Sequence, residues 1–333
     1  MPMQWMTPVE VEPAPFWFSP IDQVMVLGSC FADTMGERLS DSKFRVDVNP
    51  FGPLYHPIVV AHSLVRLLDR LPLMDEEWVS RDGMWYSWTH HSRYAGATRL
   101  ACEQVINKRM EQAMNHFVGC NRLILTLGSS YRYELKEKPG YVVANCHKFP
   151  QQMFTRRRSS IAEMVEALSL ALDRFFNKQT EAKVLFTVSP IRHTKDGAHA
   201  NAVSKALLLA TVDELVTRYG DRVAYFPSYE IVMDELRDYR FYAEDMVHLS
   251  AQAEQYIWDR FKCSFMTTET QQALKAYAKI RQAIAHRPFN TAGKAYRQFI
   301  IQTLLKIEQV EKKFTYFDLS QEKEILNKRL DKL

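Results

Sequence analysis

Short apolar runs that end in a turn and lead into a stretch with helical spacing recur along this chain. The clearest runs are residues 23–27, 122–127 and 183–188. Continuous apolar strands that alternate with helices are typical of a parallel sheet covered by helices on both faces. We therefore predict an α/β fold of the doubly wound, three-layer α/β/α type, in which ligands bind beyond the carboxyl ends of the strands.

Weaker patterns extend this prediction. Strands are expected at 44–48 and 222–226, and turn signals at 82–83 and 138–140 predict two hairpins inserted beside the sheet. Apolar residues at helical intervals predict helices over 58–71, 101–118, 160–176 and 201–218.

The last part of the chain has a different character. Helical spacing continues from about residue 251 to residue 306, and the charged stretch that follows keeps apolar residues at helical intervals. We expect an α/β domain over residues 1–265 and a helical C-terminal extension over residues 266–333. The extension is a candidate surface for forming a homo-oligomer.

Composition narrows the class of function. The chain has 333 residues and a formal net charge of +4, enough for one large core but too little charge to favour nucleic-acid binding. Five scattered cysteines without a C-x-x-C pair favour reduced thiols in a cytoplasmic compartment. No signal-like N-terminus and no apolar run of about 18 residues is present, so we expect no membrane partner.

Four histidines raise the question of a metal site. No H-E-x-x-H motif or acidic cluster accompanies His90, His91, His193 or His199, so neither a metal nor an organic cofactor is expected.

Residues suited to acyl transfer gather at the predicted strand ends. A nucleophile needs a base, a group that orients the base, and N–H groups directed at the developing oxyanion. A helix that begins just after Gly28 would supply N–H groups and lower the pKa of a thiol. The candidates at the strand ends are Ser29, Cys30, Asn49, Gly52, Gly128, Ser129, Ser130, Arg192, His193, Asp245 and His248.

Several blocks resemble a known family. The segment LGSCFADTMGERL is similar to the N-terminal signature of the GSCFA family, a branch of the SGNH/GDSL hydrolase superfamily, and LTLGSSYRY, ANCHKFP, SPIRHTKDG and FPSYEIVMDELRDYRFYAEDMVH resemble its later blocks, over roughly residues 20–250. The resemblance implies a flavodoxin-like fold and hydrolysis of an ester or acyl group. It also implies a D-x-x-H block, matched by Asp245 and His248, in which His248 is the general base and Asp245 orients it.

The chain departs from the superfamily pattern in two places. Where the first superfamily block has its nucleophilic serine, this chain has Cys30, so Cys30 and Ser29 both remain candidate nucleophiles. Where the third block has an asparagine amide, this chain has Ser130. The N–H of the nucleophile, the N–H of Gly52 and a group near Gly128 or Ser130 are then the expected oxyanion donors. Asn145 is a candidate replacement for the missing amide, with His147 near it.

Each candidate also has a structural interpretation. Cys30 is equally a small buried apolar residue, and Ser29 an ordinary helix N-cap. Asp245 and His248 could mark a solvated helix start, and Arg192 with His193 either binds a substrate anion or stabilises a strand end. The function we expect is a hydrolase or acyltransferase acting on a small-molecule ester or thioester, such as an acylated carbohydrate. The alternative is a non-catalytic binding protein that retains the cleft.

Overall fold

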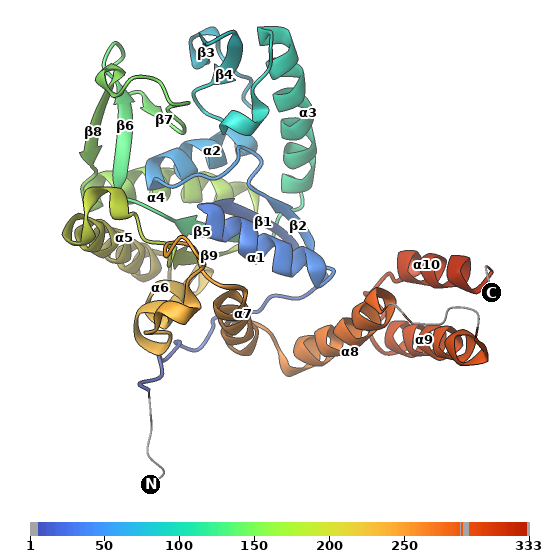
Figure 1. Ribbon diagram of the computed structural model, residues 1–333. Coiled ribbons are helices and arrows are strands. Elements are labelled where there is room, and N and C mark those ends of the chain that lie inside the picture. Colours follow the sequence, from blue (N-terminus) through green and yellow to red (C-terminus); the bar gives the residue numbers. More distant parts are fainter. Residues whose placement is uncertain (1–5, 287, 289–292, 332–333) are drawn as a thin grey trace.

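The centre of the protein is a five-stranded parallel sheet (Figure 1). This computed structural model describes residues 6–286, 288 and 293–331. The strands follow the order β10-β9-β5-β1-β2, so the chain builds outward from β1 in both directions. Their bounds are Gln23–Gly28 for β1, Arg45–Val48 for β2, Arg122–Leu127 for β5, Lys183–Val188 for β9 and Val223–Tyr225 for β10.

Apolar residues on both faces of the strands explain why the sheet is buried. Val24 and Val26 belong to one apolar cluster, whereas Met25 and Leu27, between and after them, belong to the cluster on the opposite face. Successive side chains of a strand point to opposite faces, so a continuous apolar run requires cover on both sides. The predicted strands at 23–27, 122–127 and 183–188 are confirmed.

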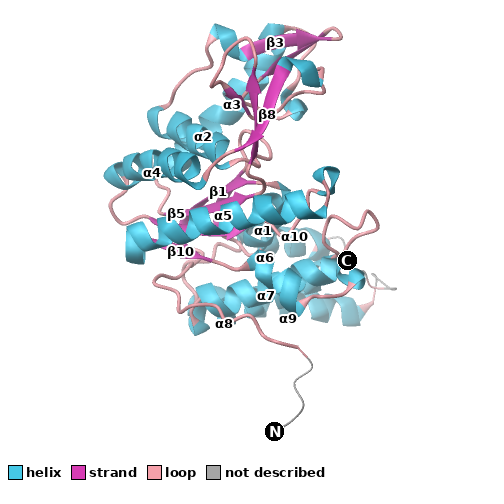
Figure 2. Ribbon diagram, turned by 90° about the vertical axis from the view of Figure 1, so that its left-hand side faces the viewer, coloured by secondary structure: helices cyan, strands magenta, loops and turns pink. Residues whose placement is uncertain are grey.

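Helices provide that cover in two layers (Figure 2). Four helices pack on the face that carries Met25 and Leu27, and two helices pack on the face that carries Val24 and Val26. The first group is α2 (Pro57–Asp69), α3 (Arg99–Phe117), α4 (Ile161–Lys178) and α5 (Ala198–Tyr219); the second is α1 (Cys30–Asp41) and α7 (Ala251–Phe265). The fold is therefore the expected three-layer α/β/α arrangement.

Two small antiparallel sheets lie above the carboxyl edge of the main sheet in Figure 1. One is the predicted hairpin of β3 (Trp78–Arg81) and β4 (Met84–Ser87). The other joins β6 (Tyr131–Leu135) to β7 (Val142–Val143) and to β8 (Phe154–Arg158). The sequence did not predict β8, because its FTRRR segment carries one apolar residue and shows no alternation.

The C-terminal helices pack on one another beside the α/β body (Figure 1). Residues 268–285 form α8, residues 294–313 form α9 and residues 320–330 form α10. Ion pairs from Lys43 to Glu322 and from Asp41 to Arg281 connect them to the end of α1. Within the part of the chain that the structure describes, no helix combines the length and apolar character needed to cross a membrane.

Candidate active site

Cys30 stands at the first position of α1, directly after β1. The turn that places it there depends on Gly28, whose φ is +143° and where an added Cβ would lie 2.1 Å from the carbonyl oxygen of Thr126. Ser29 occupies the N-cap position, but its side chain makes no capping hydrogen bond, and its buried Oγ has no partner among the described residues. The thiol, by contrast, is partly exposed.

His248 and Asp245 meet Cys30 across the edge of the sheet. The Cys30 Sγ lies 3.8 Å from His248 Nε2, and His248 Nδ1 lies 2.6 Å from Asp245 Oδ2. The other carboxylate oxygen of Asp245 accepts hydrogen bonds of 2.9 Å from the N–H groups of Val247 and His248. Nucleophile, base and orienting carboxylate therefore form a continuous chain of contacts.

The Asp245–His248 pair is open to solvent, with side-chain exposed fractions of 51% and 53%. The hydrogen bond from His248 and the two from backbone N–H groups lower the pKa of Asp245 to about 2. The carboxylate is thus ionised throughout the neutral range and holds the histidine ring by its Nδ1.

The pKa of the Cys30 thiol is raised, contrary to the expectation from its place at a helix start. Burial raises it first, and the Asp33 carboxylate adds to the effect. Hydrogen bonds from the N–H of Cys30, the Tyr55 hydroxyl and the N–H of Phe31 act in the opposite direction without cancelling the increase. The helix N-terminus does favour the thiolate, but here burial and a neighbouring carboxylate outweigh it.

Asn49 shapes the turn around Cys30 without reaching the cleft. Its buried side chain accepts a 2.9 Å hydrogen bond from the Gly28 N–H and donates one of 2.8 Å to Asp33. The N–H of Gly52, expected to stabilise an oxyanion, instead donates to the Asn49 carbonyl at 2.8 Å. That expectation is wrong because a tight turn with φ of 42° at Asn49 uses the Gly52 N–H internally.

The groups near Gly128 and Ser130 are also engaged within the protein. The N–H of Gly128 donates to the Tyr55 carbonyl at 2.9 Å, and the N–H of Ser130 donates to Ser204 Oγ at 2.9 Å. These two N–H groups are therefore not free to stabilise an oxyanion, whereas Ser129, between them, lines the cleft beside Cys30. The N–H groups of Cys30 and Phe31, directed at Sγ, have no acceptor one turn earlier in a helix and remain the best-placed donors.

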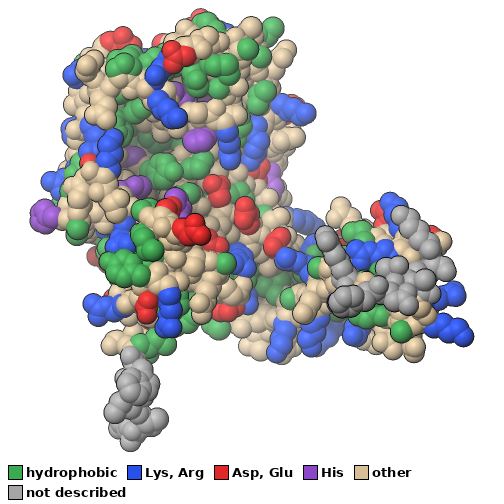
Figure 3. Space-filling model, viewed as in Figure 1, with side chains coloured by type: hydrophobic (Ala, Val, Ile, Leu, Met, Phe, Trp, Pro, Cys, Tyr) green, Lys and Arg blue, Asp and Glu red, His purple; other side chains and the backbone are tan. Residues whose placement is uncertain are grey.

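A cleft of about 550 Å³ opens beside the thiol. Cys30 and His248 line it, together with Tyr131, Tyr133 and Arg156. Figure 3 shows histidine, acidic and hydrophobic side chains together in the middle of this face. A cavity of this size suits a small molecule or part of a larger substrate.

Four further residues were predicted to contact the substrate. Three of them line the cleft and one does not. Asn145, Arg192 and His193 line it, whereas His147 is not part of its lining. His147 is instead buried and hydrogen-bonded through both ring nitrogens, to the Ser92 side chain and the Ser87 carbonyl. Asn145 accepts from the His147 N–H through its side-chain oxygen, so its amide nitrogen is the part left for a ligand.

Arg192 contacts the loop that carries Asp245 and His248. It donates to the Met246 carbonyl at 2.9 Å, and its guanidinium lies 4.5 Å from the centre of the Tyr242 ring. The His193 ring packs edge-on against Tyr55, and burial lowers the pKa of His193 to about 4. Arg192 therefore supports the position of the His248 loop, while His193 is a neutral wall of the cleft.

Sequence reasoning missed two polar groups behind the cleft. Lys205, on α5, is 1% exposed and donates to the carbonyls of Gly128 and Ser189 at 2.8 and 2.7 Å. Burial lowers the pKa of Lys205 to about 7. Lys205 belongs to no recognisable motif. The only signal in the sequence is a single lysine within an otherwise apolar helical stretch.

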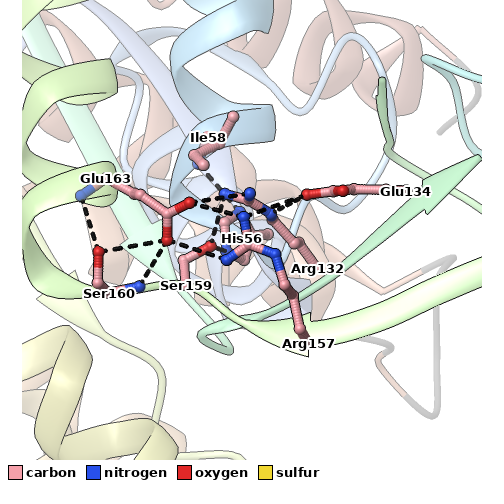
Figure 4. A network of polar contacts seen from close by, with 8 residues as sticks. All are labelled: His56, Ile58, Arg132, Glu134, Arg157, Ser159, Ser160 and Glu163. Atoms are coloured by element: carbon pink, nitrogen blue, oxygen red, sulfur yellow. Dashed lines mark hydrogen bonds and ion pairs between the residues drawn. The ribbon is translucent and has the colours of Figure 1, made fainter. Parts of the chain in front are cut away.

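The second group is a network centred on His56 (Figure 4). His56 caps α2 by accepting from the Ile58 N–H, and its other ring nitrogen contacts Ser159 Oγ at 3.0 Å. Ser159 in turn accepts from Arg132, which pairs with Glu163. The network ties the start of α2 to the β6–β8 sheet and fixes the floor of the cleft.

Metal binding finds no support among the residues that the structure describes, where no group of three or more His, Cys, Asp or Glu side chains is arranged to hold an ion.

Comparison with known proteins identifies the family. A model of the GSCFA family matches residues 23–261, and a model of the GSCFA domain protein C-terminal domain matches residues 277–332. The first match covers the whole sheet, both sides of the cleft and the Cys30, Asp245 and His248 positions. Comparison with curated proteins gave no match. This chain belongs to the GSCFA family.

Proposed function

We propose that this protein is a thiol-dependent acyl hydrolase or acyltransferase of the SGNH/GDSL type, acting on an ester or thioester. The observation that carries the proposal is the line of contacts from Asp245 through His248 to Cys30 at the edge of a cleft of about 550 Å³. Three groups with these chemistries in this order are the requirement for covalent acyl transfer.

In the proposed reaction, His248 Nε2 takes the thiol proton as Cys30 Sγ adds to the carbonyl carbon of the substrate. The tetrahedral intermediate then expels the alcohol or thiol leaving group, which receives that proton from His248. Water or an acceptor hydroxyl, deprotonated by His248, attacks the resulting thioester. The second tetrahedral intermediate then breaks its C–S bond, Sγ takes the proton back from His248, and the product leaves as an acid after attack by water or as a new ester after attack by an acceptor hydroxyl.

Stabilisation of the oxyanion falls to the start of α1. The N–H groups of Cys30 and Phe31 point toward Sγ, and the positive end of the helix dipole lies at the same place. Asn145 lines the cleft, and its amide nitrogen is a third candidate donor.

The raised pKa of the Cys30 thiol favours one of two forms of the mechanism. A preformed thiolate–imidazolium pair requires a low thiol pKa. Here the thiol is the resting form, so proton transfer to His248 accompanies attack on the carbonyl. Asp245 supports this form because it orients the ring and stabilises the imidazolium that develops.

A carbohydrate ester is a suitable substrate class. Tyr131 lies in the cleft wall with the Arg156 guanidinium 3.9 Å from its ring centre, and Tyr133 lies beside them. Aromatic faces and fixed cations of this kind stack on sugar rings and bind polar substituents. The five cysteines are free, which fits a reducing, cytoplasmic setting.

Release of p-nitrophenolate from p-nitrophenyl acetate tests the proposal. Cys30→Ala and His248→Ala should each lower kcat/KM to the background rate. Cys263→Ala, which removes an exposed thiol of α7 outside the cleft, is the matched control and should match wild type. Equal rates in wild type and Cys30→Ala, across several esters and thioesters, would contradict the proposal.

A second candidate function is ligand binding without turnover. It is favoured by the internal use of the Gly52, Gly128 and Ser130 N–H groups, which leaves the oxyanion to donors at the start of α1. On this view a carbohydrate or acyl ligand binds the cleft with nearly unchanged affinity in Cys30→Ala and His248→Ala, and no variant shows covalent labelling.

A further inference from the structure

A second cavity lies next to the cleft along α2. Its volume is about 350 Å³, and it is lined by residues of α2, α4 and the β6–β7 hairpin. Val59 and Ala144 line both this cavity and the cleft that contains Cys30. The two cavities are therefore neighbours at these residues, and we call the second one the α2 groove.

Residues of helix α2 line both cavities. Tyr55, just before the helix, and Val59 line the cleft, whereas Val59, Ser63 and Arg66 line the α2 groove. Spacings of four and three residues put Val59, Ser63 and Arg66 on one face of the helix. From Val59 to Arg66 this face of the helix measures about 10 Å at the helical rise of 1.5 Å per residue, close to the length of an extended decanoyl chain.

The lining of the α2 groove suits a hydrocarbon chain. Val142 of the hairpin contributes to it, and Leu71 and Leu170 line it while remaining 44% and 58% exposed. Large apolar side chains left in solvent along a groove mark a binding surface.

The far end of the α2 groove is charged. Arg66 pairs with Glu77 there, and Arg174 pairs with Asp69 beside it. Both arginines are satisfied by carboxylates, so these ion pairs close the apolar path and do not offer an unpaired charge. An occupant with an apolar body and no charged tail fits this arrangement.

We infer that the α2 groove binds the hydrocarbon chain of an acyl substrate, with its carbonyl at Cys30 and its chain running along α2 past Val59 and Ala144. The inference rests on the proposed acyl transfer and names its substrate class: medium-chain acyl esters or thioesters. Each methylene buried completely strengthens binding about fourfold, so a ten-carbon chain should be preferred clearly over a two-carbon or four-carbon chain.

Two substitutions test the groove without touching the Cys30 cleft. Leu170→Asp places a charge on an exposed groove residue, and His62→Trp fills the groove from the exposed side of α2. Leu100→Asp is the matched control, because Leu100 is 64% exposed on α3 and lines neither cavity. None of these side chains is part of the core, so all three variants should fold.

The first measurement is calorimetric binding of decanoate and of butyrate to wild type and the three variants, which needs no turnover. Decanoate should bind wild type at least tenfold more tightly than butyrate, and Leu170→Asp and His62→Trp should each weaken decanoate binding about tenfold. Leu100→Asp should leave it unchanged. Equal affinity for the two acids, or decanoate binding unaffected by both groove variants, would overturn the inference.

A second measurement separates this inference from the proposed function. Acylation of Cys30 by p-nitrophenyl decanoate and by p-nitrophenyl acetate is followed by mass spectrometry. Acylation that shows no preference for the longer chain counts against the groove and leaves acyl transfer standing. Chain-selective binding of decanoate without acylation of Cys30 by either ester supports the groove and counts against catalysis.

Discussion

Cys30 Sγ lies 3.8 Å from His248 Nε2 although 218 positions separate the two residues in the sequence. The contact joins the start of α1 to the loop before α7, two segments on the same side of the sheet. Asp245 completes the chain of contacts from that same loop. The proposed acyl transfer depends on this contact between the thiol and the imidazole.

Asp245→Asn should lower kcat/KM for p-nitrophenyl acetate about a hundredfold. The amide no longer stabilises the imidazolium, but the exposed position makes the loss smaller than the roughly 10⁴-fold loss at a buried triad aspartate. Asp238→Asn is the control, because Asp238 also accepts a backbone N–H in an exposed loop but lies outside the cleft lining. A rate for Asp245→Asn within twofold of wild type would contradict the orienting role.

Asp33→Asn should speed the alkylation of Cys30 by iodoacetamide at pH 7.5 severalfold. The Asp33 carboxylate raises the pKa of this thiol, so its removal increases the thiolate fraction. In wild type the rate should still be rising above pH 9, because the thiol pKa exceeds its ordinary value of 9.0. Peptide mapping gives the rate at each cysteine, and exposed Cys263 serves as the internal control. Unchanged or slower labelling of Cys30 would contradict the prediction.

Lys205→Met should remove a pH dependence of stability. The pKa of Lys205 is lowered from 10.5 to about 7, so between these values the unfolded chain binds a proton that the folded chain lacks. The stability of wild type relative to Lys205→Met should therefore rise with pH from 7 to 10, by at most about 1.4 kcal/mol per pH unit. Urea unfolding at several pH values measures this, with Lys275→Met, at an exposed position, as control. If the difference in stability between wild type and Lys205→Met did not change with pH, folding would not lower the pKa of Lys205.

Asn49→Ala should lower the free energy of unfolding by about 2 kcal/mol or more. It leaves the buried Gly28 N–H without its acceptor, and it puts a Cβ without a polar group at a φ of 42°. Asn49→Gly relieves the backbone cost but not the lost hydrogen bonds, so its loss should be smaller. Equal stability of Asn49→Ala and wild type in urea unfolding would contradict the role given to this side chain.

The sheet could be predicted because its signal is local. Strands such as 122–127 are apolar throughout, and Asp82-Gly83 marks its hairpin because both residues take positive φ. The β8 strand was not predicted because it is a strand through its pairing with β6 and not through its own composition. The expected self-association of the C-terminal extension stays a prediction, while Ile307, Leu319 and Leu326 are buried within the chain itself.

The candidate site could be predicted only in part, for a physical reason. The chain order of Cys30, Asp245 and His248 was visible in the sequence, but whether a backbone N–H is free depends on turns that no motif encodes. The N–H groups of Gly52 and Gly128 are occupied by carbonyls of neighbouring loops. The burial that raises the pKa of the Cys30 thiol likewise arises only from tertiary packing.

The most direct test of the central claim is peptide-mapping mass spectrometry after brief incubation with p-nitrophenyl acetate, comparing wild type, Ser29→Ala and His248→Ala. We predict an acetyl adduct on Cys30 in wild type and in Ser29→Ala, and its loss in His248→Ala, with labelling of Cys263 equal in all three. An adduct on Ser29 instead of Cys30 would identify Ser29 as the nucleophile. Labelling of Cys30 that does not depend on His248 would contradict the proposed mechanism.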